Sequence, residues 1–302
     1  MALLTALCAV PLVLFGGSVT TLGAGMAVEG WLIAEGHFLV FFPVEKWFRD
    51  TATFVEHTHR LFGVLVGLAA IATVVATWRS RLSRRAKLAA LGGLLLICAQ
   101  GALGGFRVLE SSPQLAFVHG AFAQGVFAYL WALVLVLSPR WQERSTPASP
   151  APLGWRALCV VTPLVVYAQI VVGAWYRHAL RPTPLEDASN RLALHLVGAF
   201  VVLAFVVTFA LRLQARAQAD PLAARSAKRI GIVLGFQVFL GLTAWVGYKP
   251  DSVGPAEWLV SILHVLGGAV LLAECGRAAL CVLRPRSATT PRSLERLRSA
   301  HA

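Results

Sequence analysis

Charged side chains are scarce in this chain of 302 residues, where Asp, Glu, Lys and Arg together make up only 14%. Hydrophobic residues make up 57% of the chain, and its mean hydropathy is +0.70. A soluble domain of this length carries many more charged groups. The scarcity therefore excludes an ordinary soluble protein and predicts that most of the chain lies in a membrane.

Cysteines are also few. The chain has five, Cys8, Cys98, Cys159, Cys275 and Cys281, and all of them lie in apolar stretches. The absence of C-x-x-C argues against a cysteine-based metal site, and the absence of C-x-x-C-H argues against covalent attachment of haem. We interpret the five cysteines as small core residues.

Acidic residues are about half as frequent as basic ones, with 14 Asp and Glu against 27 Lys and Arg and a net charge of +13. Most basic residues lie in alternate connections, at 79–87, 140–156, 212–229 and 277–298. The positive-inside rule then predicts that these connections and both termini are cytoplasmic. The basic excess indicates topology and contact with anionic lipid, and no nucleic-acid partner is expected.

Long hydrophobic runs are abundant. A membrane-spanning helix needs about 20 mostly apolar residues. Eight runs meet this requirement, at about 3–22, 54–77, 88–106, 114–137, 156–176, 192–211, 230–247 and 258–283. They predict an all-α polytopic membrane protein, with eight transmembrane helices arranged as two pseudo-symmetric four-helix bundles.

A stretch rich in Pro, Ser and Ala marks the boundary between the two halves. It reads SPRWQERSTPASPAPLGW and occupies 138–155. Such a composition is typical of a connection. We therefore predict an N-terminal bundle at 1–137, a cytoplasmic linker at 138–155, a C-terminal bundle at 156–283 and a basic cytoplasmic tail at 284–302.

A repeated pattern relates the two halves to each other. The spacing Q-x-x-x-G occurs at Gln100–Gly104, Gln169–Gly173 and Gln237–Gly241. Each copy is followed by a connection and then by an apolar run with a histidine near its start. These histidines are His119, His195 and His264, and His59 has the corresponding place in the second run. We interpret the glycines as close helix contacts and predict that the four histidines lie at one depth, near the outer surface.

Four histidines at one depth make two pairs, one in each predicted bundle. Helical bundles hold cofactors between facing helices, and imidazole is a common axial ligand of haem iron. We predict two bis-histidine haem sites, His59 with His119 and His195 with His264. Candidates to bind haem propionates are Arg60, Arg107 and Arg177. The alternatives are interhelical hydrogen bonds or zinc for the histidines, and lipid headgroups for the arginines.

Glu56 distinguishes one histidine from the other three. It lies three residues before His59, on the same helical face, and no carboxylate has this place before the other histidines. A carboxyl group in a poorly solvated site can exchange protons near neutral pH. We predict a catalytic acid–base role for Glu56 beside a substrate haem, with the second haem as an electron carrier. The alternative is an ion pair between Glu56 and Arg60.

Two other polar residues in apolar surroundings receive structural interpretations. Glu274, deep in the last apolar run, is expected to pair with Arg277. His178 follows Arg177 at the membrane edge and is expected to face solvent.

Several segments of the chain resemble the heme A synthase family. They are GGSVTTLGAGMAV at 16–28, EHTHRLFG at 56–63, QGALGGFRV at 100–108, LAFVHGAFAQ at 115–124, QIVVGAWYRH at 169–178, LALHL at 192–196 and ILHVLGG at 262–268. The resemblance extends over nearly the full length. Its specificity comes from the E-x-x-H-R element combined with three further placed histidines.

The resemblance implies oxidation of a ring methyl group of heme O to a formyl group, which gives heme A for terminal oxidases. It implies that His59 and His119 flank the substrate haem and that His195 and His264 hold a heme b cofactor. Glu56 would assist proton transfer or the attack of water on the methyl carbon. The implied location is a bacterial cytoplasmic membrane or an equivalent inner membrane, with the haem sites toward its outer face.

The resemblance also has limits. Many family members have a cysteine pair in the first outer loop, whereas this chain has no cysteine there, so a thiol–disulfide step is in doubt. Heme O synthase and oxidase assembly factors are expected partners by resemblance alone, and self-association is left open. Two other functions compete: a bis-histidine cytochrome carrying electrons between a quinol and an outer partner, and a haem-handling protein without redox chemistry.

Overall fold

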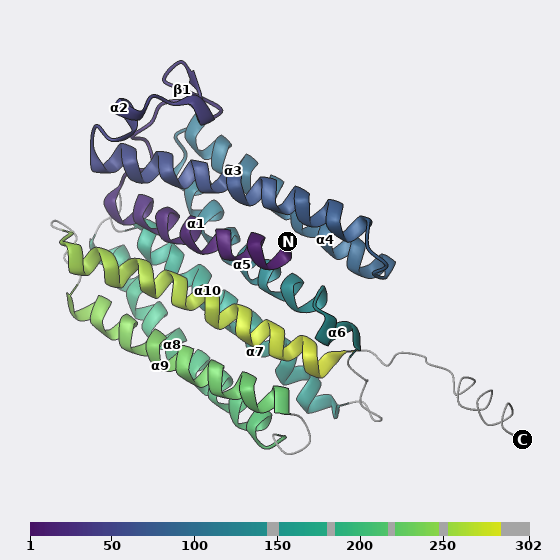
Figure 1. Cartoon of the computed structure of the whole chain (residues 1–302). Coiled ribbons are helices and arrows are strands. Elements are labelled where there is room, and N and C mark those ends of the chain that lie inside the picture. Colours follow the sequence, from purple (N-terminus) through teal and green to yellow (C-terminus); the bar gives the residue numbers. More distant parts are fainter. Residues whose placement is uncertain (144–150, 180–184, 217–220, 248–252, 285–302) are drawn as a thin grey trace, which may run out of the picture.

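The computed structural model describes residues 1–143, 151–179, 185–216, 221–247 and 253–284 (Figure 1). Eight long helices dominate this part of the chain. They are α1 (Ala2–Leu22), α3 (Thr51–Trp78), α4 (Arg84–Leu109), α5 (Pro113–Val136), α7 (Leu153–Ala179), α8 (Leu185–Gln214), α9 (Pro221–Gly247) and α10 (Pro255–Leu283). All eight contain a segment long and apolar enough to cross a membrane. The predicted class, an all-α polytopic protein with eight spans, is confirmed.

Three of the long helices, α3, α4 and α5, begin where short polar side chains cap them. The Asp50 carboxylate accepts a hydrogen bond from the Thr53 backbone N–H, which also holds the pKa of Asp50 below its ordinary value. Ser83 caps α4 in the same way, and Ser112 caps α5 just before Pro113. Because capping residues are polar, several helices begin a few residues before the apolar runs that predicted them.

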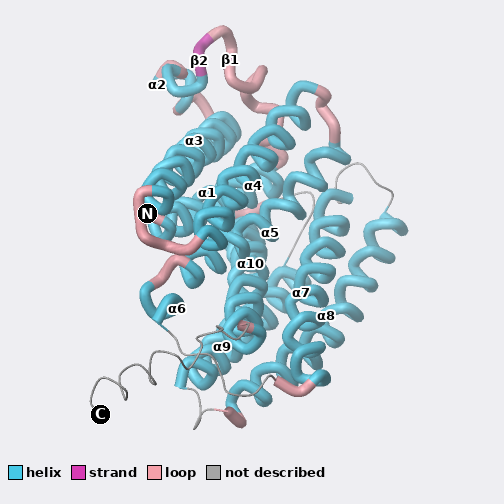
Figure 2. Tube along the Cα trace, turned by 90° about the vertical axis from the view of Figure 1, so that its right-hand side faces the viewer, coloured by secondary structure: helices cyan, strands magenta, loops and turns pink. Residues whose placement is uncertain are grey.

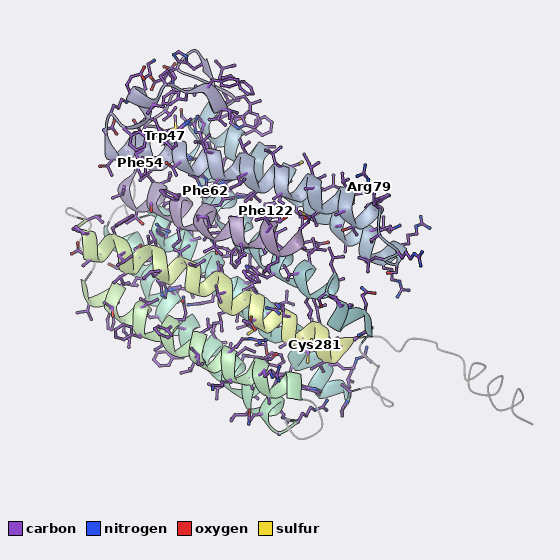
Figure 3. The ribbon with its side chains drawn as sticks, in the orientation of Figure 1. Trp47, Phe54, Phe62, Arg79, Phe122 and Cys281 are labelled. Carbon is purple, nitrogen blue, oxygen red and sulfur yellow. The ribbon has the colours of Figure 1, made fainter. Side chains whose placement is uncertain are left out.

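The connection between α1 and α3 forms a small folded segment of its own, which we call the outer segment (residues 23–50). It contains the antiparallel strands β1 (Ile33–Ala34) and β2 (His37–Phe38), the 3₁₀ helix η1 (Leu39–Phe41) and the short helix α2 (Val44–Trp47). Figure 3 shows Trp47 near Phe54 at this end of the molecule and Arg79 at the opposite end of α3. We call these the outer and inner ends.

The long helices pack in two groups. Helices α1, α3, α4 and α5 contact one another in a ring, and α7, α8, α9 and α10 form a second ring. The rings share an interface, because α10 contacts both α1 and α5, and α5 contacts α7 (Figure 2). The predicted domain boundaries stay a prediction. Residues 144–150 of the linker and 285–302 of the tail lie outside the described residues. The remaining short helix, α6 (Pro139–Glu143), follows α5.

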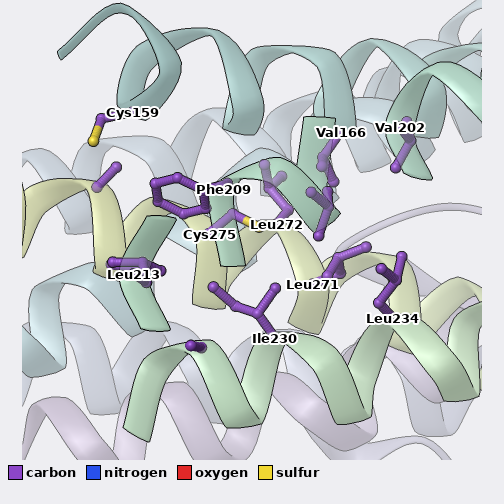
Figure 4. Packing of buried hydrophobic residues seen from close by; sticks show 14 of the residues in the cluster. Cys159, Val166, Val202, Phe209, Leu213, Ile230, Leu234, Leu271, Leu272 and Cys275 are labelled. Carbon is purple, nitrogen blue, oxygen red and sulfur yellow. The ribbon is translucent and has the colours of Figure 1, made fainter. Parts of the chain in front are cut away.

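The two larger apolar clusters lie toward the inner end, and a small one lies in the outer segment. In the second ring, Phe209, Leu213 and Ile230 are fully buried against Cys159 and Cys275 (Figure 4). The interpretation of these two cysteines as core residues agrees with this packing. At the ring interface, small residues of α1 and α10 pack against Phe127 and Leu130 of α5. Tight packing at the inner end leaves the outer halves of the helices to surround a cavity.

One ion-pair cluster lies within this inner half. Glu274 accepts hydrogen bonds from Arg277 at 3.1 Å and from Arg229 of α9 at 2.8 Å. The predicted pair with Arg277 is confirmed, and Arg229 is an addition that ties α9 to α10. Glu274 is therefore a structural group.

Replacing Glu274 with Ala should lower the free energy of unfolding by about 2 kcal/mol, since both arginines lose a charged acceptor. Thermal unfolding of the purified protein in detergent measures the change. Glu110→Ala, at the exposed outer end of α4, is the control. Equal melting temperatures for the two variants would contradict a stabilising role for Glu274.

Candidate functional site

One continuous cavity of about 1670 Å³ occupies the outer halves of both rings. All four predicted histidines line it, and so do Arg60, Arg107 and Arg177. Most other lining residues are glycines and apolar side chains of the long helices. The sequence predicted two separate sites, whereas the structure joins them within a single space that extends across the ring interface.

The two histidine pairs have nearly the same geometry. The ring centroids of His59 and His119 are 6.3 Å apart, with an angle of 86° between the ring planes. For His195 and His264 the separation is also 6.3 Å, and the angle is 83°. The repeat seen in the sequence is therefore a repeat of the site itself.

Each imidazole lies against a glycine of the preceding long helix. The four contacts are Gly16 with His59, Gly104 with His119, Gly173 with His195 and Gly241 with His264. A methyl group at any of these glycines would lie only 2.8 to 2.9 Å from the Cε1 atom of the ring. The glycines of the Q-x-x-x-G pattern are thus close-packing positions, as predicted, and the group packed against them is the histidine.

The glutamines of the pattern contact the same histidines. Gln100 donates a hydrogen bond from Nε2 to the backbone oxygen of His119 at 2.9 Å, and Gln169 donates to that of His195 at 2.6 Å. In the third copy, Nε2 of Gln237 lies 3.4 Å from Nε2 of His264. A glutamine one turn before the glycine therefore helps to fix the histidine-bearing helix.

The surroundings of His59 differ from those of the other three histidines. Four residues before Gly16, where the pattern would place a glutamine, α1 has Leu12. The Nδ1–H of His59 donates to the backbone oxygen of Leu12 at 3.0 Å. A carbonyl oxygen can only accept, so Nδ1 carries the proton and Nε2 keeps its lone pair for a metal. Sequence comparison of the spans missed the Leu12–Gly16 element, since it shares only the glycine with the other three.

Glu56 belongs to a buried polar cluster beside the first histidine pair. Its side chain is fully buried; Oε1 accepts from Arg60 at 2.8 Å, and Oε2 accepts from the backbone N–H of Val28 at 3.0 Å. Arg107 lies 3.8 Å from Oε1. The Glu56–Arg60 ion pair, the alternative weighed from the sequence, is present. Glu56 is not among the cavity-lining residues of the described chain, whereas both arginines are.

The outer segment closes over this cluster. Arg60 donates to the backbone oxygens of Val28 and Gly30, both at 2.8 Å. The indole of Trp31 lies directly over Gly105 of α4, where no larger side chain would fit. These contacts hold the outer segment against α3 and α4, so that Trp31 forms part of the cavity wall.

Arg177 and His178 lie where the two rings meet. Arg177, on α7, donates to the backbone oxygen of Gly17 and to the hydroxyl of Thr21, both on α1. His178 packs against the ring of Phe117 and lines the cavity. The expectation that His178 faces solvent was wrong, because the end of α7 packs against α5 at this level.

The residues present fit a haem in each histidine pair. Two bonds of about 2 Å between a metal and imidazole nitrogens require ring centres separated by about the distance observed. The glycines leave room for the rings, and the buried Nδ1 of His264 has no hydrogen-bond partner within the described chain. No group of three or more His, Cys, Asp or Glu among the described residues could hold a metal ion. Zinc, which prefers four such ligands, therefore fits less well.

Comparisons with known proteins show a family and relatives of the chain. The family model described as cytochrome oxidase assembly protein matches residues 1–182, more than half of the chain. The chain is 25% identical over 182 residues to a heme A synthase of Alkalihalophilus pseudofirmus, covering 59% of each protein. It is 26% identical over 196 residues to a heme A synthase of Methylobacterium radiotolerans, covering 54% of this chain and 52% of that one. The predicted resemblance to the heme A synthase family is confirmed.

A third relative has another name. The chain is 33% identical over 116 residues to a protoheme IX farnesyltransferase of Haloarcula marismortui, covering 38% of this chain and 23% of the relative. All three matches span less than two thirds of the relative's own length. No solved structure matches the chain.

The glycine contacts predict a specific sensitivity of haem binding. Gly173→Ala should weaken haem binding at His195 and His264 by roughly tenfold or more, because the new methyl group displaces the ring of His195. Gly104→Ala should do the same at His59 and His119.

Absorption spectra during haem titration of each variant measure the affinity. Gly276→Ala on α10 is a matched control, since a methyl group there meets no atom within 4 Å. If Gly173→Ala binds haem as tightly as the unmodified protein does, the glycine contact does not determine ring position.

Proposed function

The chain belongs to the cytochrome oxidase assembly protein family, and on that premise we propose that it acts as a heme A synthase. The reaction would oxidise a ring methyl group of heme O, a haem with a long isoprenoid side chain, to a formyl group. The protein would be an oxidoreductase of a cytoplasmic-type membrane. Its inner end, with the basic residues 79–87, would face the cytoplasm, and the cavity would lie toward the outer face.

The observation that carries this proposal is the difference between two otherwise similar histidine pairs. The separations and ring angles of the two pairs are almost the same. Within the described chain, however, only the His59–His119 pair has a buried carboxylate with two arginines beside it. An electron carrier alone has no need of such a group. We therefore assign the substrate haem to His59 and His119, and the resident heme b to His195 and His264.

The second pair is the simpler one. Gly173 and Gly241 leave room for the two rings, and Gln169 fixes the backbone of His195. Bound there, heme b would supply one-electron transfer. The protein would hold the two imidazoles facing each other. The mostly apolar walls of the cavity would exclude water from the space between them.

Around the first pair, the arginines and Glu56 have separate tasks. Arg60 and Arg107 line the cavity with only 9% and 14% of their side chains exposed, so they can bind haem propionates as buried cations. A propionate on Arg60 competes with Glu56 for the guanidinium. We infer that this competition frees the Glu56 carboxylate to exchange a proton at the substrate. Arg177 is proposed to hold a propionate at the ring interface.

The partners follow from the substrate. A heme O synthase would deliver the substrate, and oxidase assembly factors would receive the product; the similarity to a farnesyltransferase that acts on protoheme IX supports the first of these links. Anionic lipid would contact the basic inner end.

One observation favours a second candidate. The near-identity of the two pairs is what a membrane cytochrome with two resident haems would show. Such a protein would pass electrons between a quinol and an outer partner and would leave both haems chemically unchanged.

Extraction of non-covalent haem after co-expression with a heme O source separates the two candidates. The intact protein should yield heme A together with heme b. His195→Ala should lose the low-spin heme b signal, whereas His37→Ala, in the outer segment, should keep it. Two equivalents of heme b without any heme A would favour the cytochrome instead.

The role of Glu56 can be separated from that of its ion pair. Glu56→Gln removes the charge but keeps one acceptor oxygen, which can serve either Arg60 or the Val28 N–H, so bound haem should be retained. Conversion of heme O should fall by about 10²–10⁴-fold, the usual contribution of a general acid or base. Glu56→Ala should lose conversion too, and should also be less stable by about 3–5 kcal/mol, because Arg60 stays buried without its partner. Normal conversion in Glu56→Gln would leave Glu56 with a positioning role alone.

A further inference from the structure

The cavity wall of the first ring has a glycine on each of α3 and α4, close to the histidine pair. Gly63 of α3 and Gly101 of α4 both line the cavity, and a methyl group at either position would meet no atom within 4 Å. Neither position is buried. The first ring therefore has unfilled space beside its histidine pair at these two glycines, which we call the gap between Gly63 and Gly101.

The second ring has larger side chains at the matching positions. The histidines and their glycines give the correspondence, since His59 matches His195 and Gly104 matches Gly241. The matched positions are Gly63 and Ala199, Val64 and Phe200, Gly67 and Leu203, and Gly101 and Val238. In every case the first ring has the smaller residue. The two histidine pairs are alike, and the walls beside them are not.

The depth of the gap indicates what it can hold. Gly63 lies one helical turn from His59, and Gly101 about one turn from Gly104, in both cases toward the inner end. The neighbouring side chains Leu65, Leu68 and Leu95 are 45% to 60% exposed, as expected for a surface against lipid. A polar group would be costly at this place, whereas a hydrocarbon chain is stable there.

We propose that the gap between Gly63 and Gly101 holds the isoprenoid side chain of the substrate haem, which runs from the His59–His119 site toward the bilayer. The bulkier wall of the second ring then favours a haem without such a chain at His195 and His264. This proposal rests on the proposed function and adds the feature that directs the two haems to different sites. A lipid acyl chain has the same apolar chemistry, so the test must distinguish the two occupants.

The test compares a haem with the side chain and a haem without it. Protein in phosphatidylcholine nanodiscs, with heme b already bound at His195 and His264, is titrated with heme O or with heme b at the first site. Gly101→Leu and the double variant Gly63→Leu/Gly101→Leu fill the gap. We expect them to raise the Kd for heme O by roughly tenfold or more and to leave the Kd for heme b unchanged.

Controls exclude general effects of a larger side chain. Gly235→Leu, on α9, introduces the same residue at an exposed glycine with no atom within 4 Å and outside the cavity lining. It should change neither Kd. The low-spin spectrum of the resident heme b reports in each variant whether the bundle is intact.

Two results would overturn the proposal. Equal weakening of heme O and heme b would mean that the larger residues disturb the whole site. An unchanged Kd for heme O would mean that the side chain lies elsewhere or that lipid fills the gap. Failure of the proposed function looks different, because the unmodified protein would then yield no heme A in the extraction experiment.

Discussion

Close approach of an imidazole ring to a helix backbone is the contact on which the site depends. A helix normally presents a Cβ at every position, and a ring at van der Waals distance from that atom would be displaced away from the helix and toward its partner histidine. Four glycines remove this obstacle, one for each histidine. The rings can then lie back against the preceding helix and leave space between them. The same contact repeated four times sets both pairs at the same separation.

Keeping such a space open in a membrane protein has a structural cost that the inner end offsets. The cavity removes packing from the outer half of each ring, so the helices must be held together elsewhere. The buried cluster around Phe209 and Cys275 does this in the second ring, and small residues bring α1 and α10 close to α5 at the interface. The outer segment contributes from the other end, where Arg60 binds its backbone and Trp31 covers Gly105.

Much of this arrangement could be predicted from the sequence, because apolar length, basic connections and histidine position are local signals. The eight spans and the pairing of His59 with His119 and of His195 with His264 are of this kind. The spacing of Glu56 and Arg60 indicated their ion pair, but the other surroundings of Glu56 could not be predicted. Its spacing from His59 indicated a shared face, yet the carboxylate is held by a backbone N–H of Val28, a contact across 28 residues that no local pattern encodes. The outer segment, which showed little pattern, likewise owes its position to tertiary contacts. His178 was misjudged for a similar reason, since packing against α5 determines its exposure.

Under the proposed function, the two rings would serve two purposes without a change in the contact between histidine and glycine that they share. Moving a histidine would alter the separation of the two rings and therefore their fit to a metal. The positions of the paired histidines can therefore differ little between the two rings. The walls are less constrained, because a side chain facing lipid can be large or absent at little cost to packing. Differences therefore accumulate around the pairs: a leucine carbonyl replaces a glutamine beside His59, a carboxylate joins two arginines at the outer end, and glycines replace bulkier residues between α3 and α4. All three lie in the first ring, and under the proposed function they would separate a site for an exchanging haem from a site for a resident one.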